Sequence, residues 1–118
     1  MAYVWAHRGA SAYAPENTME AFRLAAEMHA DGIELDVHMT KDGYIVVTHD
    51  ENVKRVTGGV DRCIADMTLE EVRQLDVCNG MEAYRGARIP QLSEVLEFLQ
   101  TNEMTLNIEI KTTDNFYP

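Results

Sequence analysis

The chain has 118 residues, of which 46% are hydrophobic and 25% are charged. This length supports one ordinary domain, and this composition is typical of a globular chain with a packed core. The formal net charge is −10, which opposes binding to nucleic-acid phosphates and to anionic lipid surfaces. We therefore expect neither nucleic acid nor a membrane as a stable partner.

The sequence shows no pattern of an export signal or a membrane span. The N-terminus MAYVWAHRGA has no basic stretch followed by an apolar run, and no segment approaches the roughly 20 apolar residues that cross a bilayer. Cys63 and Cys78 lack the spacing of metal ligands, so we expect two reduced, partly buried thiols. These features predict a cytoplasmic protein.

Short apolar runs alternate with helical patterns along the chain. In chain order, the patterns predict a strand over residues 3–6, a helix over 17–30, strands over 33–39 and 44–48, a short helix from residue 68, a helix over 92–100 and a strand over 105–111. Asn17 or Thr18 can cap the first helix, and Thr68 with Glu71 forms a capping box. Strands that alternate with helices indicate an α/β fold with a mainly parallel sheet.

Helical spacing predicts which side chains face the core, and Asp42-Gly43 predicts a turn between the second and third strands. The expected buried stripes consist of Met19, Phe22, Ala26 and His29 in the first helix and of Leu92, Val95, Leu96 and Leu99 in the last. His29 is therefore interpreted as structural.

The second predicted strand carries acidic residues on one face. Glu34, Asp36 and His38 alternate with apolar residues, and the Cα atoms of the two carboxylates should lie roughly 6–7 Å apart. Their side chains can converge on one cation, which would offset the cost of burying like charges. The alternative is an exposed antiparallel strand with solvated acids. We assign no role to His38.

The fourth predicted strand repeats this pattern with Asn107, Glu109 and Lys111. Glu109 could supply a third carboxylate, and Lys111 could supply a cation for a phosphate. The alternative is an ordinary Glu–Lys pair on the surface.

Histidines follow the first and third predicted strands at the same relative place. His7 and His49 therefore stand where barrel enzymes carry catalytic groups, and histidine can serve as a general acid or base near neutral pH. Each alone could be structural. Arg8 could hold a phosphoryl oxygen, and Glu16-Asn17 lies at a helix N-terminus, which favours an anion, although Asn17 could be only a cap.

These motifs, in this order and spacing, resemble the glycerophosphodiester phosphodiesterase family. They are His7-Arg8-Gly9, Pro15-Glu16-Asn17-Thr18, Glu34-Leu35-Asp36-Val37, His49-Asp50 and Ile108-Glu109-Ile110-Lys111, supported by the stretches over residues 50–55 and 89–96. The resemblance covers nearly the whole chain. It implies a TIM (β/α)₈ barrel fold, of which this chain carries about the first four strands.

The resemblance also implies metal-dependent hydrolysis of glycerophosphodiesters, such as glycerophosphocholine or glycerophosphoethanolamine, to sn-glycerol 3-phosphate and an alcohol. The roles it implies are metal ligation of Mg²⁺ or Ca²⁺ by Glu34, Asp36 and Glu109, acid–base catalysis by His7 and His49, and substrate or phosphate binding by Arg8, Glu16, Asn17 and Lys111. The carboxylate donors agree with a hard cation.

The length departs from the family, because a complete barrel takes about 250 residues. We therefore expect residues 1–118 to form a single, C-terminally truncated partial barrel whose open sheet edges favour self-association. Two alternatives stay open at this point. One is a related barrel phospholipase, phosphatidylinositol-specific or similar to sphingomyelinase D. The other is an inactive half-barrel that serves as a binding module.

Overall fold

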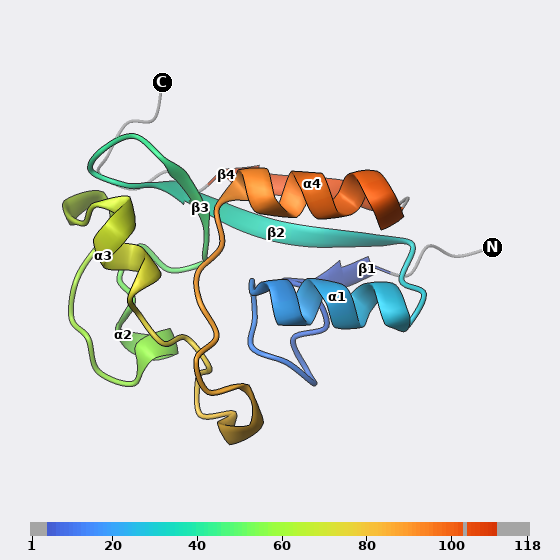
Figure 1. Ribbon diagram of the computed structural model, residues 1–118, viewed down its shortest axis with the longest axis horizontal. Coiled ribbons are helices and arrows are strands. Elements are labelled where there is room, and N and C mark those ends of the chain that lie inside the picture. The colour runs from blue at the N-terminus through green and yellow to red at the C-terminus, as the bar shows by residue number, and fades with distance from the viewer. Residues whose placement is uncertain (1–4, 103, 111–118) are drawn as a thin grey trace.

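The computed structural model of the chain describes residues 5–102 and 104–110 (Figure 1). The element order is β1 (Trp5–His7), α1 (Met19–Glu27), β2 (Gly32–Met39), β3 (Ile45–Val47), α2 (Lys54–Thr57), η1 (Ile64–Asp66), α3 (Leu69–Arg73), η2 (Glu82–Tyr84), α4 (Leu92–Asn102) and β4 (Thr105–Ile110), where η denotes a 3₁₀ helix. Within the described part, no helix is long and apolar enough to cross a bilayer. The cytoplasmic location stays a prediction.

Strand β2 lies at the centre of a four-stranded sheet. Strand β4 runs parallel to it from Gly32 to Val37, and β1 runs parallel to it from Gly32 to Glu34. Because a strand has two edges, β1 and β4 must flank β2 on opposite sides. The parallel order β1-β2-β4 is the beginning of the α/β barrel that the sequence predicts.

Strand β3 is antiparallel to β2, on the same edge as β1. Val37 of β2 is paired with both Val47 of β3 and Ile110 of β4, so β3 and β4 lie on opposite edges. The predicted turn at Asp42-Gly43 therefore makes a hairpin, with Gly43 at φ +88°. The expectation that His7 and His49 follow equivalent strands is wrong: β3 turns the chain back, and the amide of Thr48 donates to the carbonyl of Asp36 in mid-strand (2.9 Å).

Helices α1 and α4 cover the apolar face of the sheet. Ile33, Leu35 and Val37 pack there against Phe22 of α1 and Val95 of α4. The buried stripe of α1 consists of Ala21, Phe22 and Ala25, whereas His29 of the predicted stripe is exposed, because the helix ends at Glu27 and His29 turns at φ +59°. In α4, Leu96 is also exposed (41%), since the buried stripe there follows Val95 and Leu99.

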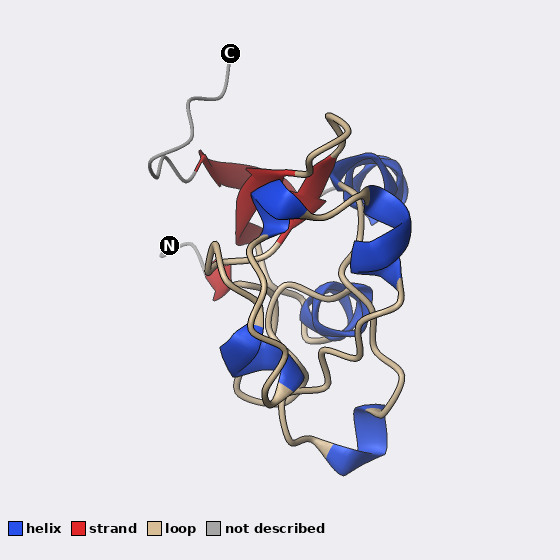
Figure 2. Ribbon diagram, turned by 90° about the vertical axis from the view of Figure 1, so that its left-hand side faces the viewer, coloured by secondary structure: helices blue, strands red, loops and turns tan. Residues whose placement is uncertain are grey.

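The remaining elements form a connecting segment, residues 40–91, between β2 and α4. This segment occupies one end of the molecule in Figure 1 and faces the viewer in Figure 2. Its short helices enclose a second core of buried side chains, which consists of Val46, Val53, Val56, Ile64, Met67, Val72, Val77, Ala87 and Ile89. Successive residues of β3 belong to different cores, since Val46 faces this core and Val47 faces the first.

The parallel sheet has open edges within the described part of the chain, where β1 and β4 each pair only with β2. Trp5 of β1 and Ile108 of β4 are large apolar residues with 44% and 38% of their surface exposed. Exposed strand edges of this kind favour pairing with another chain. Self-association of this protein stays a prediction.

Candidate active site

The loop between β1 and α1 holds Arg8 and Asn17 in unusual backbone conformations. Both have φ +55°, a left-handed value that is rare for arginine. The amide of Arg8 donates to the carbonyl of Glu34 (2.7 Å), and the amide of Asn17 donates to the carbonyl of Arg8 (2.8 Å). These bonds fix both residues beside β2. Such strain is often found at functional sites.

Gly9 allows this loop to pass close to α1. Its φ is +79°, and a Cβ atom there would lie 2.8 Å from the backbone carbon of Ala21. Only glycine fits at that position without a shift of the helix or the loop. The cap of α1 is Thr18, whose hydroxyl accepts from the amide of Ala21 (3.2 Å). Asn17 is therefore not the cap, and its side chain is available to the site.

The acidic face of β2 lies against the loop between β1 and α1. Asp36 is buried; its Oδ2 atom accepts from Nδ2 of Asn17 (3.2 Å) and lies 3.5 Å from Nε of Arg8. Glu34 is partly buried, and its Oε2 atom lies 3.3 Å from Nε2 of His7. The alternative that the acids of this strand are exposed and solvated is therefore wrong for Asp36.

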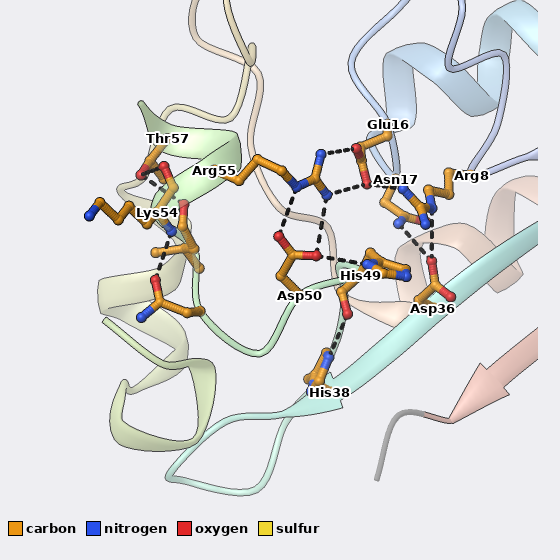
Figure 3. Close-up of polar contacts among 12 residues, drawn as sticks. Arg8, Glu16, Asn17, Asp36, His38, His49, Asp50, Lys54, Arg55 and Thr57 are labelled. Carbon is orange, nitrogen blue, oxygen red and sulfur yellow. Dashed lines mark hydrogen bonds and ion pairs between the residues drawn. The ribbon is translucent and has the colours of Figure 1, made fainter. Parts of the chain in front are cut away.

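The connecting segment contributes His49, Asp50 and Arg55 to the same place (Figure 3). Nδ1 of His49 lies 2.7 Å from Oδ1 of Asp50. Nε of Arg55 donates to Oδ2 of Asp50 (2.8 Å), and Nη1 of Arg55 donates to Oε1 of Glu16 (2.6 Å). Glu16 also accepts from Nη1 of Arg8 (3.1 Å). A continuous polar chain thus runs from His49 to Asp36.

The ion pairs of this chain set the charge of its acids. Burial raises the pKa of Glu16, but hydrogen bonds and charge from Arg55, together with the charge of Arg8, leave that pKa below its usual value. Hydrogen bonds from Arg55, helped by His49 and opposed by burial, lower the pKa of Asp50 to about 2. The bonds to Glu16 and Asp50 raise the pKa of Arg55 further. All three side chains are charged near neutral pH.

The structure brings together most of the predicted site residues. His7, Arg8, Glu16, Asn17, Glu34, Asp36 and His49 lie in contact with one another or with shared partners. The side chain of Glu109 and the whole of Lys111 lie outside the described residues. The backbone register pairs the Cα atoms of Asp36 and Glu109.

A divalent cation fits the described donors in part. Glu34 and Asp36 offer carboxylate oxygens, which suit Mg²⁺ or Ca²⁺. The Oε1 atom of Glu34 is buried and has no hydrogen-bond partner among the described residues, and such an atom is costly unless something binds it. The described residues contain no group of three or more His, Cys, Asp or Glu side chains placed to hold a metal ion.

Three residues of the candidate active site were given no role by the sequence prediction. Asp50 and Arg55 belong to a stretch that resembles the family, but only the fold shows that they meet Glu16, which lies 39 residues before Arg55. His38 is buried, and its Nε2 atom donates to the carbonyl of His49 (2.9 Å). Its place on the acidic face of β2 was the only signal for it.

Polar side chains gathered at one end of parallel strands are typical of sites in α/β proteins, and comparisons with known proteins identify the family. The model of the glycerophosphoryl diester phosphodiesterase family matches residues 7–116. The chain belongs to this family.

Individual relatives give the same result. The chain is 50% identical to a glycerophosphodiester phosphodiesterase of Caldanaerobacter subterraneus, over 98% of this chain and 47% of the relative. Its structure is similar to the crystal structure of a glycerophosphodiester phosphodiesterase from Agrobacterium tumefaciens (TM-score 0.88, 38% identity, 97% of this chain and 49% of that chain). It is also similar to an Oleispira antarctica phosphodiesterase in complex with the product sn-glycerol-3-phosphate (TM-score 0.87, 38% identity, 97% and 46%).

These structural neighbours are TIM barrels, so the predicted fold class is confirmed. The chain spans about half the length of the relatives it matches. That residues 1–118 form a single, C-terminally truncated partial barrel stays a prediction.

Proposed function

We propose that this chain supplies the catalytic half of a metal-dependent glycerophosphodiester phosphodiesterase. The observation that carries the proposal is that Glu34 and Asp36 of β2 lie beside His7 and Arg8 at one end of a parallel sheet. Ion pairs through Asp50, Arg55 and Glu16 join His49 to Arg8. In α/β barrels the carboxyl ends of the strands are where catalytic groups are found. The proposed products are sn-glycerol 3-phosphate and an alcohol.

In this proposal Glu34 and Asp36, together with Glu109, hold Mg²⁺ or Ca²⁺. The cation would polarise a phosphoryl oxygen and stabilise the charge that grows on it. Arg8 binds a phosphoryl oxygen beside that position, and Lys111 adds a second positive charge. Glu16 and Asn17 orient Arg8 and Asp36, since each already bonds to one of them.

The two histidines exchange protons with the attacking water and the leaving alcohol. One acid–base group contributes about 10²–10⁴ to a rate, so two contribute at most ~10⁸, which is roughly 11 kcal/mol. Phosphate esters are among the slowest uncatalysed substrates. Charge stabilisation by Arg8 and the other cationic groups must therefore supply much of the remaining acceleration.

The test combines cation binding with turnover. Calorimetric titration of the purified chain with Mg²⁺ or Ca²⁺ should show binding that Glu34→Gln weakens by at least tenfold. Release of sn-glycerol 3-phosphate from glycerophosphocholine should stop with a chelator and in Glu34→Gln, and should fall ~10²-fold or more in His7→Ala and His49→Ala.

Glu82→Gln is the matched control, because Glu82 forms an exposed ion pair with Arg85 far from β2. It should leave both measurements unchanged. Full activity in Glu34→Gln would rule out the metal assignment. Cation binding that depends on Glu34, without turnover, would mean that this chain binds the metal ion but does not hydrolyse the substrate by itself.

A further inference from the structure

His49 is held by a relay of charged groups that crosses from the connecting segment to Glu16, in the loop between β1 and α1. Asp50 contacts Nδ1 of the ring at 2.7 Å, and Arg55 contacts Asp50 through Nε at 2.8 Å and Nη2 at 3.3 Å. The same guanidinium holds both oxygens of Glu16, at 2.6 and 3.1 Å. Figure 3 shows Arg55 between the two carboxylates, with the His49 ring on the far side of Asp50.

The chemistry of this contact specifies where the neutral His49 ring carries its proton. Hydrogen bonds from Arg55 lower the pKa of Asp50 to about 2, so Asp50 is ionised near neutral pH and can only accept. Nδ1 of His49 must therefore be the donor. The second ring nitrogen, Nε2, then keeps its lone pair and is the atom that can take up or return a proton.

Arg55 determines the direction of Asp50. Its planar fork matches two carboxylates at once, which an ammonium group cannot reproduce. Because Glu16 is also held by Arg8, the relay ties the orientation of His49 to the phosphate-binding arginine. The carbonyl of His49 accepts from buried His38, so the backbone of this residue is fixed as well as its ring.

We propose that Asp50 and Arg55 are positioning residues that hold His49 in the Nδ1–H form, with Nε2 directed to the reacting groups. This inference rests on the proposed function for the use of Nε2. The tautomer itself does not depend on any activity. Neither residue touches the reacting atoms in this scheme, so neither is a catalytic residue.

The experiment is ¹⁵N NMR of the histidine rings in the full chain, at a pH where His49 is neutral. The wild-type protein should show His49 with the proton on Nδ1. Asp50→Asn and Arg55→Gln should lose this preference, and the ring should return toward the mixture of tautomers of a solvated histidine. Arg55→Lys should keep part of the preference, because it keeps the charge but not the fork.

Arg73→Gln is the matched control. Arg73 is as exposed as Arg55 (45% each) and forms an ion pair with Glu94 at 2.7 Å, away from His49. It should leave the His49 signals unchanged. A wild-type ring protonated on Nε2, or a Nδ1–H form that persists in folded Asp50→Asn and Arg55→Gln, would overturn the proposal whether or not the chain hydrolyses a substrate. If Arg55→Gln does not fold, the His49 signals of Asp50→Asn decide between these outcomes.

Discussion

The barrel segment (residues 5–39, 92–102 and 104–110) and the connecting segment (residues 40–91) are stabilised in different ways. The barrel segment uses long regular elements, with an eight-residue β2 and an eleven-residue α4 around one apolar core. The connecting segment has a core of similar size, but its helices have three to five residues. Turns, caps and ion pairs must therefore fix much of its conformation.

This difference explains where the site lies. The barrel segment supplies Glu34 and Asp36 from a strand that is paired on both edges, so their positions are rigid. The connecting segment supplies His49, which reaches them only because β3 returns along β2 and Arg55 binds Glu16. The acids are fixed by the sheet, whereas the orientation of the histidine depends on the contact between the two segments.

The largest effects should come from the two cores. Phe22 and Ile64 are both fully buried, one in each core. Phe22→Ala should lower the free energy of unfolding by about 3–5 kcal/mol and Ile64→Ala by about 2–5 kcal/mol, through lost burial and the cavity left behind. Urea denaturation measures both values.

Hydrogen exchange of the same variants tests whether the segments unfold together. We expect Ile64→Ala to lower the exchange protection of amides in the connecting segment before those of β2. Phe22→Ala should lower protection in both segments, since β3 contributes Val47 to the first core. Equal loss of protection in both segments of Ile64→Ala would show that the two cores form one cooperative unit.

The sequence predicted the barrel segment well because periodicity describes regular elements. Alternation over β2 located Glu34 and Asp36 on one face, and the chain order of strands and helices indicated the fold class. Errors occurred at the ends of elements. The predicted helix over residues 17–30 begins at Met19 and ends at Glu27, and Thr18, one of the two predicted caps, is the cap. Asn17 turns outside the helix at φ +55°.

The connecting segment was less predictable because its contacts join residues far apart in sequence. Strand β3, the capping box of Thr68 and Glu71 and the turn at Asp42-Gly43 were local enough to be identified. The pairing of Arg55 with Glu16 depends on the path of the backbone between them, and no local pattern encodes that path.

Two glycines test the backbone of each segment. Gly9 and Gly58 have nearly the same φ, +79° and +76°, but a Cβ atom would be crowded by Ala21 at Gly9 and would meet nothing within 4 Å at Gly58. Gly58→Ala should cost about 1–2 kcal/mol of stability from the left-handed backbone alone. Gly9→Ala should cost more, because the loop that carries Arg8 must also move.

Thermal unfolding of the two variants compares their losses of stability, and the NMR signals of residues near Arg8 report whether the loop has moved. Equal costs for the two substitutions would mean that the close approach of Gly9 to α1 contributes nothing to stability.

Acid should produce the smallest effect and act first on the connecting segment. The described acids with a lowered pKa are Asp42, Asp50, Glu71 and Asp76 of this segment and Glu16, which binds its Arg55. Hydrogen bonds lower the pKa of Asp50 and of Glu71 to about 2, from ordinary values of 3.8 and 4.5. A lowered pKa in the folded state means that the charged acid stabilises the fold.

That stabilisation is complete above the unfolded pKa, near pH 4–5, and is lost as the pH falls toward 2. We therefore expect amide protection in the connecting segment to decline between about pH 4 and pH 2, while β2 and β4 keep theirs. Glu71→Gln should reduce the dependence on pH in this range, because one of the titrating groups is gone. Earlier loss of protection in β2 would contradict this prediction. It would mean that the apolar core, and not the ion pairs, stabilises the short helices of the connecting segment.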